Sequence, residues 1–354
     1  MSTSATTSAA ATGRHHRIVI VGGDTLIGYC CAMECLKHKE HHSHVRVGYM
    51  NEHSPFLKDL KSKGAEMMHF KLDDMSSMQR MYKDMMCGII CPLVFCEHYD
   101  KAKCAVEAAL KADSLKHMVM MSMMHADKMR DFDRLRPMCE MEQMFEHGMD
   151  KWDEAYIMRL SMPLESFYNM RRMIQQDREM PWPTRDQKVA PVSYFDVAKA
   201  ARCLFVKEHD VQATADDSDT EESTAKSLAR TVRERIKAIA LAGRDQQQQQ
   251  QRRHKFCMTG PESCNGEEIA EMCSRALGTR IQLKAMSPDD FAKCLKKMGE
   301  LPDEHIKTLK QIAEVIHKGM WKDKCDDLEK ILDRKPMTVE KYFQRNSDSF
   351  KPHQ

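Results

Sequence analysis

The feature that most constrains the fold is a regular alternation of short apolar runs with longer amphipathic segments from residue 17 onwards. Segments with helical patterns separate five apolar runs that are typical of strands: RIVIVG, HVRVGYM, AEMMHFKL, GIICPLVFC and KHMVMMSM. Strands that alternate with helices in this way form parallel sheets with helices on both faces. The alternation therefore predicts an α/β protein with a doubly wound parallel sheet.

The rhythm loosens after residue 150, where we expect a sixth strand in EAYIMRLSMPLESFY and a helix opened by Asp196. An acidic serine-rich run, a basic amphipathic stretch from Lys226 to Leu241 and six consecutive glutamines then mark an insertion. Nucleotides bind doubly wound sheets at the carboxyl ends of the strands, near the point where the strand order reverses. The predicted organisation is therefore a disordered tail at 1–16, a dinucleotide-binding domain at 17–160 and a smaller, mostly helical lobe for a substrate or partner at 161–354. The insertion interrupts this lobe at about 208–254.

Composition excludes several classes of protein. The net charge is only +2, so no global attraction to nucleic acid is encoded. No apolar run approaches the roughly 18 residues of a membrane span. Fourteen cysteines without a secretory signal indicate reduced thiols, and hence the cytoplasm or alternatively the nucleus. We interpret Cys30 and Cys31 as buried structural residues, and the histidine-rich segment HKEHHSH as a solvated loop rather than a metal site.

A glycine turn follows the first apolar run, in the sequence VGGDTLIG. Gly22 suits a tight turn there, Gly28 suits close packing of helix on strand, and Gly23 adds backbone freedom. Thr25 stands where a dinucleotide-binding turn would place another glycine, with its hydroxyl available to donate to a phosphate oxygen. Placement between a strand and a helix that begins near Leu26 and Ile27 predicts a cofactor-type turn.

An ordered series of segments resembles the NmrA-like family, atypical members of the short-chain dehydrogenase superfamily. The segments that carry the resemblance are GAEMMHFKLDD, AALKADSLKHMVMMSM, EMEQMFEHGMDKWDEAYIMRLSMPLESFY, VAPVSYFDVAKAA, FCMTGPESCNGEEIAEMCSRALGTRIQLKAMSPDDFAKCL and TVEKYFQRNSDSF. The resemblance implies a Rossmann-type fold, NADP or NAD as cofactor, and a role in redox-sensing regulation through a protein partner.

The resemblance assigns twelve cofactor-binding residues to this chain. They are Gly22, Gly23, Thr25, Leu26, Ile27, Gly28, Met50, Asn51, Leu72, Asp73, Cys96 and Ser122. Several nearby positions depart from the family pattern. Met50 replaces an arginine that would pair with the 2′-phosphate of NADP, with Glu52 close by, so the preference between NAD and NADP stays open. Lys71 replaces an aspartate that accepts from the adenine amino group, and Asp73 could take over only if the loop is shifted.

Hydride-transferring members of the superfamily use a tyrosine and a lysine four residues apart, together with a serine on the fifth strand. Ser122 matches the serine, but no such pair follows it. Met138 stands near the position where some atypical reductases carry a lysine, and Lys128 lies ten residues earlier. We interpret Ser122 as structural and assign no catalytic residue and no metal ligand.

Three functions remain open from the sequence. The first is an NAD(P)-binding regulatory or redox-sensing protein without efficient catalysis, acting on a protein partner and not on nucleic acid or membrane. The second is an NAD(P)H-dependent reductase of small carbonyl or quinone-like substrates, which needs little acid–base help. The third is an interaction scaffold that has lost nucleotide binding.

Overall fold

A computed structural model describes residues 17–38, 44–93, 99–205, 255–299 and 301–351. The predicted tail at 1–16 and the insertion at 208–254, with its amphipathic stretch, lie outside the described residues, as does Cys96. None of the helices in these ranges is both long and apolar enough to cross a membrane.

Seven parallel strands form one sheet in the order β3-β2-β1-β4-β5-β6-β8. The strands are β1 (Arg17–Val21), β2 (His44–Tyr49), β3 (Glu66–His69), β4 (Cys87–Ile90), β5 (His117–Met123), β6 (Glu154–Leu160) and β8 (Lys255–Met258). The strand order reverses between β1 and β4, as in doubly wound sheets. The predicted α/β fold is therefore confirmed.

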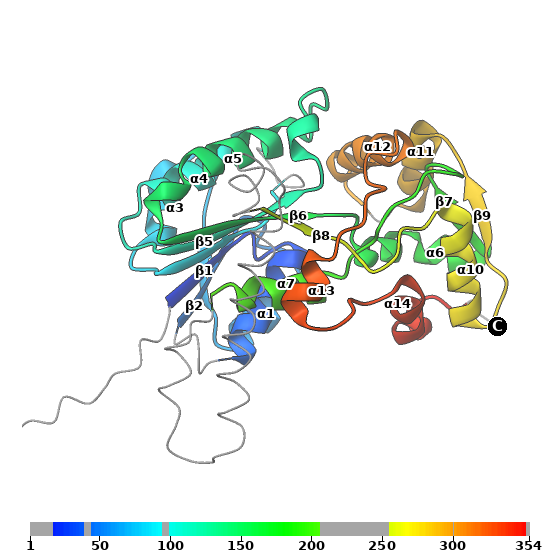
Figure 1. Cartoon of the computed structure of the whole chain (residues 1–354), viewed down its shortest axis with the longest axis horizontal. Coiled ribbons are helices and arrows are strands. Elements are labelled where there is room, and N and C mark those ends of the chain that lie inside the picture. The colour runs from blue at the N-terminus through cyan, green and yellow to red at the C-terminus, as the bar shows by residue number, and fades with distance from the viewer. Residues whose placement is uncertain (1–16, 39–43, 94–98, 206–254, 300, 352–354) are drawn as a thin grey trace, which may run out of the picture.

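Helices cover both faces of this sheet (Figure 1). One face carries α3 (Met75–Tyr82), α4 (Lys103–Leu110) and α5 (Arg136–His147), whose buried side chains share one apolar core. The other face carries α1 (Leu26–Lys37), α2 (Phe56–Ser62), α7 (Tyr194–Cys203) and α13 (Asp327–Leu332), whose buried side chains share a second core. Along β1, Val19 and Val21 belong to the apolar core between the sheet and α3, α4 and α5, called here the first core. Ile18 and Ile20 belong to the core between the sheet and α1, α2, α7 and α13, called the second core. Because alternate side chains point to opposite faces, a strand buried on both faces must be continuously apolar.

The predicted start of one helix is wrong. The helix α7 begins at Tyr194, with Ser193 as its N-cap, so it starts two residues before Asp196. The carboxylate of Asp196 instead accepts from the backbone N–H of Met337, 2.7 Å away, and pairs with Arg334. It therefore fastens a distant segment of the chain to the first turn of α7.

The second lobe is mostly helical, as expected, and lies beside the sheet (Figure 1). Its helices are α6 (Arg171–Gln176), α10 (Gly266–Leu277), α11 (Pro288–Met298), α12 (Asp303–His317) and α14 (Val339–Arg345). It also contains a small parallel sheet of β7 (Glu179–Trp182) and β9 (Gln282–Ala285), which the sequence did not predict.

The chain returns to the large sheet after building part of the second lobe. Strand β8 pairs with β6, and α13 packs against both α7 and β8. Neither return was expected from the sequence. Elements from the second half of the chain therefore complete the sheet that its first half begins.

Candidate functional site

The glycine turn lies at the carboxyl end of β1, beside the point where the strand order reverses. The backbone N–H groups of Gly22 and Gly23 both donate to the carbonyl of Gly48 on β2, at 3.1 and 2.8 Å. Gly22 has a φ of +88°, which glycine adopts without strain. A Cβ on Gly28 would lie 2.1 Å from the carbonyl oxygen of Gly22, so α1 can approach the turn only if residue 28 is glycine.

Thr25 is the N-cap of α1 rather than a free hydroxyl. Its Oγ1 donates to the carbonyl of Gly22 at 2.6 Å and accepts from the N–H of Gly28 at 3.2 Å. The expectation that this hydroxyl is available to a phosphate is therefore wrong, because the cap uses it. The N–H groups of Leu26 and Ile27 have no hydrogen-bond partner within the described chain, as is usual in a first helical turn.

The end of β2 is bound to the glycine turn by a residue that the sequence did not single out. One carboxylate oxygen of Asp24 accepts from the N–H groups of Met50 and Asn51, at 3.2 and 2.8 Å. The hydroxyl of Ser54 donates to the carbonyl of Asp24 at 3.0 Å. Glycine spacing gives no signal for Asp24, because its contacts depend on Met50, 26 residues further along the chain, and on Asn51.

The predicted residues after β2 and β3 have different surroundings. The thioether of Met50 packs against the first core, and Asn51 is exposed, with its side-chain oxygen accepting from the N–H of His53. Leu72 is 2% exposed and belongs to that same core. Asp73 is exposed, and its neighbour Asp74 caps α3. The side chain of Leu72 is therefore committed to packing, so only its backbone could contact a ligand.

Ser122 belongs to a buried polar network on β5, β6 and α5. Its hydroxyl donates to Glu142, which also accepts from Nε of Arg159 at 3.0 Å. Burial lowers the pKa of Arg159, but the hydrogen bonds and charge of Glu142 outweigh that effect and raise it. Lys255 lies 3.7 Å from the Glu142 carboxylate. The contacts of Ser122 are those of a structural strand-end residue.

A cavity of about 540 Å³ adjoins the turn and extends between the two lobes. Both Leu26 and Ser122 line it, so it reaches the first turn of α1 and the end of β5. Its wall is mainly apolar, with side chains from both lobes that include Phe56, Met123, Phe291, Leu295, Ile312 and Trp321. A mainly apolar cavity with few polar groups is typical of small-molecule sites.

The cavity wall holds no described lysine or arginine, but it includes three tyrosines, which are Tyr168, Tyr194 and Tyr342. Burial raises the pKa of Tyr194 and of Tyr342 well above the usual tyrosine range. A catalytic tyrosine requires the opposite shift, normally from a neighbouring lysine. Met138, at the position where some reductases carry a lysine, is fully buried in the core.

Glu165 is the single carboxylate among the described residues along this wall. It accepts from the hydroxyl of Ser193 and the N–H of Tyr194, at 3.1 and 3.0 Å, and so meets the N-terminus of α7. Burial raises its pKa to about 7, although these hydrogen bonds oppose the shift. An isolated acid within the apolar run SMPLESFY was the available sequence signal for this residue.

The raised pKa of Glu165 predicts a stability that depends on pH. An unfolded glutamate titrates near 4.3, so between about pH 4.5 and 7 the folded state holds the proton more often than the unfolded state. The free energy of unfolding should therefore fall by roughly 2–3 kcal/mol as pH rises through this window and then level off. Urea unfolding at pH 5 and 8 measures the difference. Glu165→Gln keeps an acceptor oxygen and should remove most of the slope; an unchanged slope would assign it to other groups.

The cysteines of the first helix are inert in this environment. Cys30 and Cys31 are 2% and 1% exposed, and burial raises the pKa of both thiols. A thiol needs a lowered pKa and solvent access to be reactive. The structural interpretation of these two residues is confirmed.

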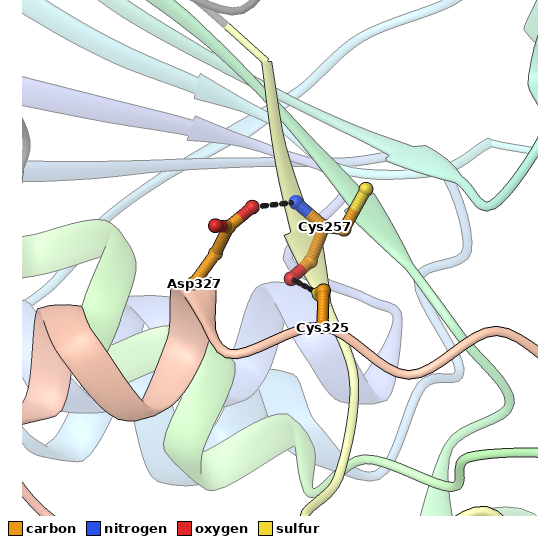
Figure 2. Close-up of side chains that lie close together, drawn as sticks. All are labelled: Cys257, Cys325 and Asp327. Carbon is orange, nitrogen blue, oxygen red and sulfur yellow. Dashed lines mark hydrogen bonds between the residues drawn. The ribbon is translucent and has the colours of Figure 1, made fainter. Parts of the chain in front are cut away.

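In the described part of the chain, one group of three possible metal-ligating side chains occurs, formed by Cys257, Cys325 and Asp327 (Figure 2). Their ligand atoms lie within 4.8 Å of one another. The carboxylate of Asp327 accepts from the N–H of Cys257 at 2.8 Å, and the thiol of Cys325 donates to the carbonyl of Cys257 at 2.6 Å. These contacts hold the start of α13 against β8, which is a structural role.

The structure thus brings the predicted turn residues 22–28 together with Met50 and Asn51, through Asp24. Ser122 and Leu26 line the same cavity. Leu72 and Asp73 follow the neighbouring strand β3, which pairs with β2. The backbone packing and the two amides without a partner in the described chain fit the pyrophosphate of a dinucleotide at the start of α1.

No protein-family model matches the sequence, and no curated protein matches it either. Solved structures match its fold over most of the chain. Triphenylmethane reductase from Citrobacter sp., complexed with NADP(H), is 14% identical, with 93% of this chain and 99% of that chain covered and a TM-score of 0.66. An NADPH-dependent quinone oxidoreductase from Escherichia coli, complexed with NADPH, is 17% identical, with coverage of 93% and 99% and a TM-score of 0.67.

The negative transcriptional regulator NmrA is a further structural neighbour, solved in complex with NADP and with NAD. It is 13% identical in both complexes, with 94% of this chain and 95% of that chain covered and a TM-score of 0.63. The resemblance stated from the sequence is therefore confirmed for the fold, which this chain shares with a regulator and with reductases.

Proposed function

We propose that the protein binds a nicotinamide dinucleotide at the β1–α1 turn and acts as a redox-sensing regulator of an NmrA-like kind, without efficient hydride transfer. The observation that carries the proposal is the contact of Gly28 with Gly22, which brings the N–H groups of Leu26 and Ile27, unpartnered in the described chain, to the carboxyl end of β1. Amides at a helix start bind a pyrophosphate through hydrogen bonds and through the helix dipole. The neighbours solved with NADP(H) or NAD support the same ligand class.

The regulatory part of the proposal rests on the lack of a tyrosine–lysine pair for proton transfer along the described cavity wall. A bound nicotinamide would supply hydride chemistry, but the chain must supply or remove a proton for most carbonyl substrates. The hydroxyl of Ser122 donates to Glu142 instead of pointing freely into the cavity. Tyr194 and Tyr342 have raised pKa values, and no described lysine lies along the wall to lower them. Glu165 lies along the wall with a pKa of about 7, but both of its carboxylate oxygens accept hydrogen bonds at the N-terminus of α7. A cofactor held without a tyrosine–lysine pair is suited to reporting its redox state to a protein partner.

A reductase of apolar quinone-like substrates is the second candidate, and the cavity favours it. Its mainly apolar wall adjoins the first turn of α1, where the cofactor would lie. Reduction of a quinone needs little acid–base help, because the reduced oxygen can take its proton from water. Two of the structural neighbours are reductases, which supports this alternative.

Two measurements test the proposal in order. Calorimetric titration of the full chain with NAD⁺, NADH, NADP⁺ and NADPH should give binding with at least one of them at micromolar to millimolar concentration. The absence of heat with all four would remove both cofactor-based functions and leave an interaction scaffold. If binding occurs, oxidation of the reduced cofactor is followed with a panel of quinones and aldehydes. No turnover above background supports the regulator, whereas steady turnover with a quinone replaces it by the reductase.

A further inference from the structure

The glycine turn carries a carboxylate, that of Asp24, beside the end of β2, where the adenosine half of a dinucleotide would lie. The end of β2 contacts the adenosine ribose in doubly wound folds, and there it distinguishes the ribose 2′-hydroxyl from a 2′-phosphate. Asp24 binds this end directly through the N–H groups of Met50 and Asn51. Two backbone hydrogen bonds therefore hold its carboxylate at the end of β2, where the ribose would lie.

No lysine, arginine or histidine in the described part of the chain forms an ion pair with Asp24, whose carboxylate contacts are the two backbone N–H groups. Its second oxygen, Oδ1, is shielded from solvent and has no hydrogen-bond donor among the described residues. A carboxylate oxygen without water or a donor is poorly screened, so its field acts more strongly on a neighbouring group.

No lysine or arginine between residues 44 and 54 is free to add a compensating positive charge at the end of β2. Met50 is neutral, and Glu52 is an exposed acid on the same loop. Arg46 is the only arginine or lysine between residues 44 and 54, and its guanidinium is bound to Glu66 and to the carbonyls of Met81 and Lys83. It is thus committed to contacts with β3 and with the end of α3.

Lys71 is a candidate cation by topology, because it follows β3, which pairs with β2. Its side chain is exposed, so salt screens its interaction with any phosphate. It offers at most a solvated contact, in place of the buried guanidinium that would normally hold a 2′-phosphate.

We propose that Asp24 is a specificity-determining residue that makes the protein select NAD(H) over NADP(H). This inference rests on the proposed function, because it concerns the adenosine half of the same cofactor. A 2′-phosphate carries almost two negative charges at neutral pH and would be repelled by Asp24 and Glu52 together. The 2′-hydroxyl of NAD is neutral and meets no such repulsion.

Asp24→Asn is the informative change, because asparagine has nearly the same shape and keeps one oxygen to accept from the N–H groups of residues 50 and 51. The wild-type protein should bind NAD⁺ about tenfold or more tightly than NADP⁺ in calorimetry at low ionic strength. In Asp24→Asn the affinity for NADP⁺ should rise about tenfold, while that for NAD⁺ changes less than about threefold. Circular dichroism and urea unfolding check that the variant is folded.

Glu52→Gln is the matched control, since it removes an exposed acid from the same loop. It should raise NADP⁺ affinity far less than Asp24→Asn, and an equal rise would show that total charge, not Asp24, sets the preference. Equal or tighter binding of NADP⁺ by the wild type overturns the inference but leaves the proposed function intact. Failure of both cofactors to bind overturns the proposed function itself, so the two failures are distinguishable.

Discussion

Replacement of Arg159 by leucine should lower the free energy of unfolding by about 3–5 kcal/mol, because it leaves a buried carboxylate without its cation. Glu142 is 3% exposed and depends on Arg159 for hydrogen bonds from the guanidinium group. The nearest remaining cation, Lys255, is 3.7 Å from the carboxylate and is also bound to Glu146. Urea unfolding monitored by circular dichroism measures the change.

Two comparisons isolate the cause of that loss. Arg185→Leu breaks an exposed ion pair with Glu267 and should cost less than about 1 kcal/mol. The double variant Arg159→Leu with Glu142→Leu removes both charges and should recover a large part of the loss, because apolar pairs often replace buried ion pairs. If Arg159→Leu costs no more than Arg185→Leu, the network does not stabilise the fold.

Replacement of Gly28 by alanine should weaken nucleotide binding about a hundredfold or more, because α1 must move away from the turn. The new Cβ would lie 2.1 Å from the Gly22 oxygen and 2.9 Å from Cα of Gly23, which are backbone atoms that cannot rotate aside. We also expect a loss of about 1–3 kcal/mol in the free energy of unfolding from overpacking. Calorimetry with NAD⁺ and urea unfolding give the two values.

Gly299→Ala provides the control for that variant. Gly299 ends α11 with a φ of +70°, and a Cβ at this position would have no neighbouring atom within 4 Å. The change should cost about 1 kcal/mol from backbone strain alone and leave nucleotide binding unchanged. Binding by Gly28→Ala as tight as that of the wild type would contradict the assignment of the turn as the pyrophosphate site.

The first six strands of the sheet could be predicted because helical segments separate them, and because the central strands β1, β4 and β5 are buried on both faces. Such burial forces a continuous apolar run, as in β1 and β5. The helices that follow differ from the strands, because their apolar residues recur every three or four positions. Strand β8 has only four residues, and its partner Ile157 lies about a hundred positions earlier. A short strand whose pairing is set by distant residues leaves no local pattern to recognise.

The sequence predicted only part of the candidate site, for a related reason. Glycine spacing identified the turn, because backbone packing depends on residue size at fixed positions such as Gly28. The partner of a hydrogen-bonding side chain, by contrast, does not follow from residue size or spacing. The hydroxyl of Thr25 could have served a phosphate or a helix cap, and only the three-dimensional arrangement shows that it caps α1. The role of Asp24 could not be predicted from the sequence, because its partners, Met50 and Asn51, are brought to it by the pairing of β1 with β2.

The return of the chain to the sheet at β8 also has a consequence for the order of events during synthesis. A nascent chain emerges from its N-terminal end, so β1 to β6 are available long before the strand that pairs with β6. Until Lys255–Met258 has been made, the outer edge of β6 lacks the strand that pairs with it. The part of the second core that Phe256 and Met258 cover also stays exposed during this time. An unpaired strand edge can associate with other chains, so a growing chain is open to aggregation in the interval before β8 is made.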